Sequence, residues 1–166
     1  MQPLGYLYKR VERRPDWLKA PNVTDIYALS GCVSANFGDY INYWKHNGFW
    51  LFDTPQVIQA LAAEHSIPLD ETRLFFYEAY ELEYDEDGGW RPYEPVSDFG
   101  VNVVEPDRKT LEGFDVVSFS TGNCPECSPL SCNGLAGELS TNEHCLFRTF
   151  DEAKQAIASA AVKRRL

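Results

Sequence analysis

Four of the five cysteines in this chain, together with one histidine, form the group of residues best suited to chemistry. Cys124 and Cys127 are spaced as C-x2-C. Cys132 stands alone in the sequence, and Cys145 directly follows His144. Zinc is commonly bound by two thiolates at the C-x2-C spacing, because a tight turn can direct both of them at one tetrahedral ion. Cys132 with either Cys145 or His144 would complete four ligands, so the group allows a structural zinc site.

Two other interpretations of these cysteines remain open. A C-x2-C pair can exchange between thiol and disulfide, and His144 beside Cys145, with Asn142 nearby, provides the residue types of a cysteine hydrolase. Neighbouring side chains on a strand point to opposite faces, however, which weakens any cooperation between His144 and Cys145. The cysteines can also be small apolar groups that are buried under a tight loop and have no chemistry of their own. The spacing does not distinguish among these interpretations.

The negative charge of the chain is concentrated in its middle third. The formal net charge is −10, and residues 70–115 contain 14 acidic against 4 basic side chains, so this segment alone accounts for the excess. Its densest part consists of Glu81, Glu83, Asp85, Glu86 and Asp87. Such a chain repels nucleic-acid phosphates, but it can attract a basic protein partner to its acidic residues. The alternative is a solvated acidic turn that only keeps the protein soluble.

Motifs of the common cofactor-dependent enzymes are missing from the sequence. It contains no G-x-G-x-x-G, no P-loop, no H-E-x-x-H and no G-x-S-x-G. No apolar run approaches the roughly 18 residues that a membrane-spanning helix needs, and the first residues lack the basic and apolar regions of a signal peptide. An odd number of cysteines without such a signal favours a reducing compartment. We therefore expect a cytoplasmic protein with neither a membrane nor a nucleic-acid partner.

The hydrophobic pattern predicts one α+β domain over residues 1–166, with a mainly antiparallel sheet and about three helices. A chain of 166 residues, 44% of them hydrophobic, is long enough for one buried core and short for two. The predicted strands cover residues 4–11, 25–30, 74–84, 101–105, 114–120, 135–139 and 144–148. One helix is predicted to begin near Asn36 and another at Thr54 before Pro55. A C-terminal helix should begin at Thr149, where Glu152 completes a capping box.

Glu78 is a carboxylate on the otherwise apolar face of the predicted strand 74–84. Such a group either pairs with a lysine or arginine or acquires a raised pKa. Pairing is the expected outcome, whereas an unpaired Glu78 would be a candidate site residue.

Two functions of different classes follow from these observations. The first is a small acidic cytoplasmic protein that binds a basic partner through an acidic face and acts as an inhibitor. In size, acidity and aromatic content the chain resembles bacterial immunity proteins and antitoxins, and the resemblance is one of composition only. The second is a zinc-binding module or a cysteine-dependent enzyme built on Cys124, Cys127, Cys132 and Cys145. We favour the binding protein over an enzyme, since the usual catalytic motifs are missing.

Overall fold

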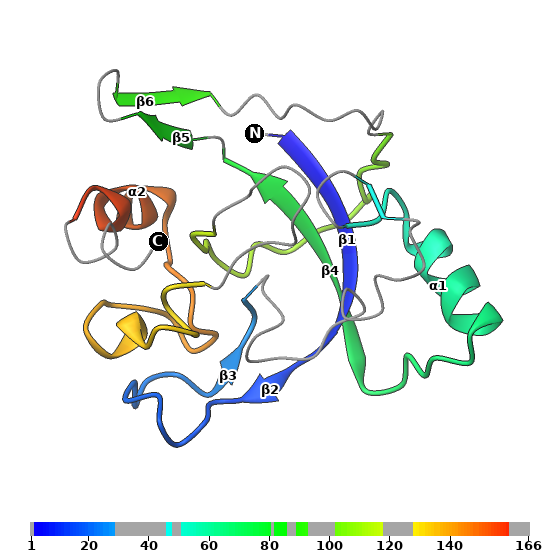
Figure 1. Ribbon diagram of the computed structural model, residues 1–166, viewed down its shortest axis with the longest axis horizontal. Helices are drawn as coiled ribbons and strands as arrows, with labels where there is room; N and C mark the ends of the chain where they lie inside the picture. The colour runs from blue at the N-terminus through cyan, green and yellow to red at the C-terminus, as the bar shows by residue number, and fades with distance from the viewer. Residues whose placement is uncertain are drawn as a thin grey trace.

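Two long antiparallel strands cross the middle of the structure. β1 (Gln2–Arg10) pairs with β4 (Thr72–Ala79), and helix α1 (Pro55–Glu64) lies beside them (Figure 1). This computed structural model describes residues 2–28, 46–47, 51–80, 82–85, 89–92, 102–117 and 128–159, with the backbone alone for 82–85 and 89–92.

A bulge in β1 requires Gly5. The register of the β1–β4 ladder shifts between Pro3 and Gly5, and Gly5 has a φ of 135°. A Cβ atom at this position would lie 2.7 Å from the carbonyl oxygen of Phe52 and 2.9 Å from Cβ of Leu51. The approach is this close because the next residue, Tyr6, is hydrogen-bonded to Phe52 along the other edge of β1, through N–O distances of 2.8 and 3.1 Å. Only glycine combines this backbone conformation with the missing side chain.

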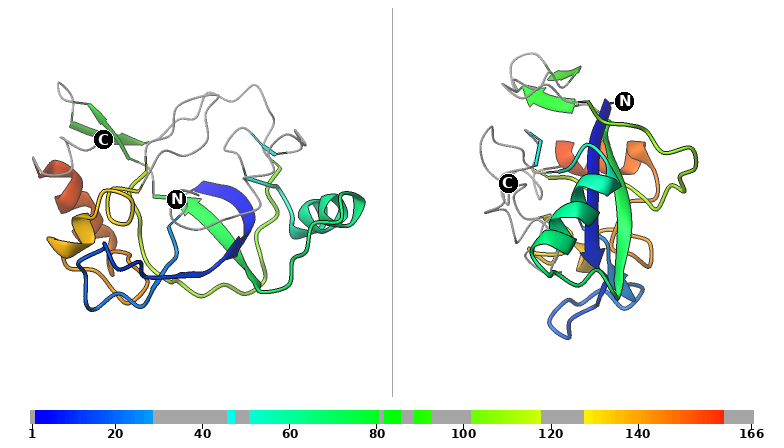
Figure 2. Two further views of the ribbon diagram at one scale, coloured as in Figure 1. Left: turned by 60° about the horizontal axis from the view of Figure 1, so that its bottom comes forward. Right: turned by 90° about the vertical axis from the view of Figure 1, so that its right-hand side faces the viewer.

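Two short antiparallel pairs complete the described strands. β2 (Glu12–Arg13) pairs with β3 (Asp25–Ile26), and β5 (Leu82–Asp85) pairs with β6 (Gly89–Pro92). The single strand expected over residues 74–84 is thus divided between β4 and β5. Figures 1 and 2 both show the β5–β6 hairpin at one end of the molecule, away from α1, β2 and β3.

Both described α-helices begin where the sequence predicts. Thr54 is the N-cap of α1, its hydroxyl accepts a hydrogen bond from the Val57 amide, and Pro55 takes a first-turn position where no N–H is needed. α2 (Phe150–Ala158) begins with the expected capping box between Thr149 and Glu152. These starts depend on contacts between near neighbours in the chain, which a sequence pattern can predict.

The combination of α-helices with antiparallel strand pairs confirms the α+β class. The expected number of about three helices is not matched by the described residues, which contain two α-helices and one short 3₁₀ helix, η2 (Leu135–Gly137). The helix predicted from Asn36 falls outside the described part of the chain except for His46 and Asn47. None of the helices that the structure describes is long and apolar enough to cross a membrane.

Two apolar clusters form the described core. The first lies between β1 and α1, and its buried members are Leu4, Tyr6, Leu7, Leu51, Phe52, Ile58, Leu61 and Ala62. The second joins β3, η2 and α2 to the connecting segments, and its buried members are Leu18, Ala20, Val23, Ile26, Ala28, Val116, Leu130, Leu135, Ala136, Cys145, Phe147, Ala153 and Ala156. Full burial of a large apolar side chain stabilises a fold by about 1.5–3 kcal/mol, so these clusters hold the helices against the strands.

The strands predicted in the second half of the chain are not formed by its described residues. The predicted strand 135–139 begins with η2 instead, because Gly134 has a φ of 74° and turns the chain into a helical path. The predicted hairpin of residues 101–105 and 114–120 is not formed by its described residues. Phe114 makes an isolated antiparallel bridge with Phe147 instead. The sequence alternation identifies apolar residues correctly here, but it does not identify the segment against which they pack.

Candidate functional site

The strand predicted to contain His144 and Cys145 is instead a turn organised by Asn142. The buried Asn142 side chain accepts hydrogen bonds from the amides of His144 at 2.9 Å and Leu146 at 3.0 Å. Its own amide group donates to the Glu112 carbonyl at 2.8 Å. Cys145, inside the turn, has a φ of 63°, in the left-handed region that an extended strand does not contain. An asparagine side chain that satisfies backbone groups in this way replaces the strand hydrogen bonds.

The His144 ring lies against Asp25 and Tyr27. Its Nδ1 atom is 2.6 Å from the Asp25 carboxylate, although the two residues are 119 positions apart in the sequence. The ring also stacks on Tyr27, with centroids 4.0 Å apart and an interplanar angle of 8°. A carboxylate on one ring nitrogen holds the imidazole in one orientation and leaves the other nitrogen available.

Glu112 and Arg73 extend the cluster around His144. Glu112 Oε2 lies 3.7 Å from His144 Nε2, and Glu112 Oε1 lies 3.4 Å from the guanidinium of Arg73 on β4. Arg73 also donates to the Tyr27 hydroxyl, and its guanidinium carbon lies 5.1 Å from the centre of the Tyr27 ring. The charged side chains are partly exposed, from 20% for His144 to 53% for Arg73, so each ion pair contributes modestly to stability. The cluster joins β3 and β4 to the Asn142 turn.

The geometry of this cluster does not support nucleophilic catalysis by Cys145. An imidazole oriented by a carboxylate is the arrangement of a general base. The second nitrogen of His144, however, faces the carboxylates of Glu112 and Glu143, at 3.7 and 3.9 Å, rather than a thiol. Cys145 is fully buried in the second apolar cluster. The two adjacent residues therefore have separate surroundings, and His144 acts as a structural link between segments.

Cys145 is a buried thiol that keeps its proton. Burial is the main reason that its pKa is raised to about 12, and the nearby Asp115 and Cys132 raise it further. Cys132 is partly buried, whereas Cys145 is buried. Because the thiolate is the reactive form of cysteine, a thiol with this pKa is almost inert as a nucleophile near neutral pH.

The Asp115 carboxylate influences both Cys145 and Tyr77. Asp115 Oδ1 accepts hydrogen bonds from the Ser128 hydroxyl at 2.6 Å and from the Val116 amide at 2.9 Å. The pKa of the Tyr77 hydroxyl is raised, first by burial and then by the same Asp115 carboxylate. A carboxylate beside protonated groups in a buried setting disfavours further negative charge there. Cys145 thus lies in an environment that opposes formation of a thiolate.

Part of the predicted zinc site lies within the described residues. Cys124 and Cys127 fall outside them. Cys132 and Cys145 lie close enough for one to affect the pKa of the other, whereas the His144 ring is bonded to a carboxylate. In the described segments, no three His, Cys, Asp or Glu side chains form a group that could hold a metal ion. The zinc hypothesis therefore stays a prediction.

The predicted partner-binding acids belong to the region of the β5–β6 hairpin. Three of them fall outside the described residues, namely Glu81, Glu86 and Asp87. Glu83 and Asp85 lie on β5, where Glu83 is opposite Arg91 and Asp85 is opposite Gly89 on β6. In the register of this ladder an acid is thus opposite a base at position 83, and an acid is opposite a glycine at position 85.

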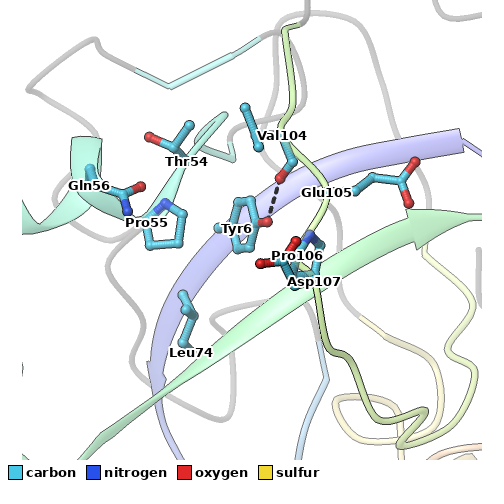
Figure 3. Close-up of a pocket in the computed structure, with 9 residues that line it drawn as sticks. All are labelled: Tyr6, Thr54, Pro55, Gln56, Leu74, Val104, Glu105, Pro106 and Asp107. Carbon is cyan, nitrogen blue, oxygen red and sulfur yellow. Dashed lines mark hydrogen bonds between the residues drawn. The ribbon is translucent and has the colours of Figure 1, made fainter.

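A groove with a volume of about 290 Å³ lies between the start of α1 and the segment 104–107 (Figure 3). Figure 3 shows the Tyr6 ring between these two sides, with Leu74 below it. The residues that matter for its chemistry are Tyr6, Pro55, Leu74, Val104, Glu105 and Asp107. Leu74 and Val104, on opposite sides of the Tyr6 ring, are 43% and 60% exposed (Figure 3). The groove thus combines apolar walls with acidic residues.

The expected pairing of Glu78 is confirmed next to this region. The ammonium of Lys109 lies 2.6 Å from the Glu78 carboxylate and 3.5 Å from the Glu105 carboxylate. It also lies 5.3 Å from the centre of the Phe76 ring. The hydrogen bond to Glu78 is the main reason that the pKa of Lys109 is raised. Glu78 is therefore a paired carboxylate rather than a candidate for acid–base catalysis.

The groove and the His144 cluster are both assembled from segments that are far apart in the chain. The Tyr6 hydroxyl donates to the Val104 carbonyl across 98 positions, and His144 meets Asp25 across 119. No spacing in the sequence indicates such contacts. The one local feature that could have indicated the groove is the run Glu105-Pro106-Asp107, in which two acids flank a rigid proline.

No protein-family model, no curated protein and no solved structure matches the chain.

Proposed function

We propose that this chain is a small acidic cytoplasmic protein that works by binding a basic protein, as an inhibitor or immunity protein does. The observation that carries the proposal is the concentration of the whole net negative charge in residues 70–115. Localised charge of one sign accelerates encounter with a partner of the opposite sign and excludes like-charged partners.

The β5–β6 hairpin is the part of this segment best suited to first contact. It lies at one end of the molecule, away from α1, β2 and β3 (Figure 2). Glu83 is opposite Arg91 in the strand register and Asp85 is opposite Gly89, so we expect a neighbouring positive charge for Glu83 and none from the ladder for Asp85. A basic partner is therefore expected to respond more strongly to a change at Asp85.

Charge reversal in β5 tests the proposal with a fluorescently labelled, lysine-rich synthetic peptide. In the double variant Glu83→Lys with Asp85→Lys, peptide binding at low salt should weaken about tenfold, because attraction is replaced by repulsion. The matched control, Asp16→Lys with Glu64→Lys, changes the net charge equally outside residues 70–115 and should weaken binding much less. Anisotropy titrations at low and at physiological salt measure both. Equal weakening in the two variants would mean that total charge alone matters and would refute an acidic binding face.

A second candidate function is a zinc-binding module that uses Cys124, Cys127, Cys132 and Cys145. The observation that favours it is that Cys132 is among the groups that raise the pKa of the buried Cys145. Zinc binds thiolates, so an ion at this place would have to displace the proton that Cys145 otherwise holds. Elemental analysis of untagged protein, with a thiol count under denaturation, tests this candidate. About one zinc per chain, released as the cysteine thiols become reactive under denaturation, would support it. Metal-free protein in which all 5 cysteines react would remove it.

A further inference from the structure

We propose that the groove beside Tyr6 is the docking site for a partner segment in which a lysine or arginine stands next to aliphatic side chains. This inference rests on the proposed function and names the part of the basic partner that is recognised. The groove's volume of about 290 Å³ is at the lower limit of pockets that hold small molecules, roughly 300–1,000 Å³. It is large enough for one or two side chains of a peptide.

The apolar walls account for the aliphatic part of the occupant. Leu74 and Val104 expose 43% and 60% of their surface and line the groove together with Tyr6 and Pro55. Leu74 belongs to β4, whereas Val104 belongs to the irregular segment that begins at residue 102. Two separate parts of the chain therefore contribute to one apolar surface. Covering these side chains would remove apolar surface from water, which is the main favourable contribution to most protein association.

The charges around the groove account for the basic part of the occupant. Glu105 and Asp107 line it, and Figure 3 shows the Glu105 carboxylate at its outer edge. The pKa of the Tyr6 hydroxyl is raised mainly by burial, then by Glu105, with Lys109 opposing and Asp107 adding to the effect. Two carboxylates against one ammonium leave the field at Tyr6 negative. A cation entering the groove would thus be attracted, and an anion repelled.

The start of α1 does not reverse this preference. A helix N-terminus carries about half a positive charge and by itself attracts anions. Here Pro55 has no N–H, and the Thr54 hydroxyl accepts a hydrogen bond from the Val57 amide. Fewer free N–H groups therefore remain at the helix N-terminus to attract an anion. The two carboxylates of the 104–107 segment outweigh what remains.

The groove wall is held in place without a partner. The Tyr6 hydroxyl donates to the Val104 carbonyl, and the Val104 amide donates to the Asp53 carbonyl at 3.2 Å. The Asp53 carboxylate in turn accepts from the Asn102 amide at 3.3 Å and from the Asn47 side chain at 3.0 Å. A wall that is ordered before binding loses little conformational entropy on binding, which favours its use as a recognition surface.

The test is an NMR titration of ¹⁵N-labelled protein with the peptide acetyl-Gly-Leu-Lys-Leu-Gly-amide. The backbone amides of Val104, Glu105 and Asp107 are expected to shift, together with that of Leu74. Two control peptides should bind less well: one with glutamate in place of lysine, which the negative field repels, and one with serine in place of both leucines. Raising the salt concentration should weaken binding of the lysine peptide.

Matched variants separate the apolar and the charged contributions. Val104→Ser should weaken binding about fivefold, whereas Leu111→Ser, at an aliphatic residue that is 68% exposed and lies outside the groove, should leave it unchanged. Asp107→Asn should weaken binding about two- to fivefold, and Asp16→Asn should not. Both groove residues are exposed, so the variants are expected to fold, and the dispersion of the amide spectrum verifies this.

Each outcome decides between the two proposals. Shifts confined to the groove amides, and lost in Val104→Ser, support the inference. Shifts at Glu83 and Asp85 with an unchanged groove would overturn the inference and leave the proposed function standing. No shift anywhere at low salt would overturn both. Groove shifts that appear when the free protein is concentrated, without peptide, would assign the groove to a second copy of the chain and overturn the inference.

Discussion

The Asn142 turn allows the most quantitative test of the structure. Asn142→Ala removes three hydrogen bonds at once and leaves the amides of His144 and Leu146 and the carbonyl of Glu112 without their partner. A buried polar group that loses its partner costs about 1–3 kcal/mol. Leu146 is buried, whereas His144 and Glu112 are partly exposed, so water can compensate part of the loss at the latter two. We expect the variant to be less stable by about 3 kcal/mol.

Urea unfolding followed by tryptophan fluorescence measures this loss, with an unchanged m-value as evidence that the unfolded state is the same. A loss of this size corresponds to a melting temperature about 6–12 °C lower in a chain of this length. Asn22→Ala is the matched control, because the exposed Asn22 side chain donates to the Thr141 carbonyl at 2.9 Å and to its hydroxyl at 3.2 Å. Thr141 is itself buried, but the exposed Asn22 side chain leaves a space that water can enter, so the control should lose only about 1 kcal/mol.

The reasoning fails if Asn142→Ala is destabilised by less than about 1 kcal/mol, or by no more than Asn22→Ala. Asn142→Asp provides an independent check of the donor side. It keeps an acceptor for the amides of His144 and Leu146, but it places a carboxylate oxygen against the Glu112 carbonyl, so it should also be clearly destabilised. Wild-type stability in Asn142→Asp would mean that the donation to Glu112 contributes nothing.

Three further predictions concern separate parts of the structure. The free energy of unfolding should fall as the pH rises from about 9 towards 12, because folded Cys145 holds its proton up to a pKa of about 12 while the unfolded thiol releases it near about 8.5. Urea unfolding across this range should show a shallower fall in Cys145→Ala, and an identical slope would contradict the burial argument. Gly5→Ala should lose about 2–4 kcal/mol, since the new Cβ would meet the Phe52 carbonyl at 2.7 Å, whereas Gly134→Ala, with no atom within 4 Å, should lose about 1 kcal/mol in the same thermal unfolding assay. Thr149→Ala should lose about 1 kcal/mol through the capping box, and an unchanged melting temperature would show that the box contributes nothing.

Some features of the fold and site could be predicted because they depend on neighbours in the chain. Thr54 before Pro55 starts α1, and Thr149 with Glu152 starts α2, each through hydrogen bonds that span three residues. The alternation of β1 likewise requires only the two-residue period of a strand. Glu78 was expected to pair because a carboxylate among apolar groups needs a partner, but no pattern named Lys109 as that partner.

The sequence by itself therefore determined the class of the fold, the starts of both described helices, the first strand and the concentration of negative charge in the middle third. The tertiary structure decided the surroundings of His144 and Cys145, because these surroundings come from distant segments. The sequence pattern predicts a strand at His144 and Cys145. In the structure, the amides of His144 and Leu146 donate to the Asn142 side chain instead, and the segment forms a turn. The groove beside Tyr6 exists only where β1, β4, α1 and residues 104–107 meet. Periodicity specifies which side of an element is apolar, but contacts across a hundred residues depend on how those apolar sides pack together.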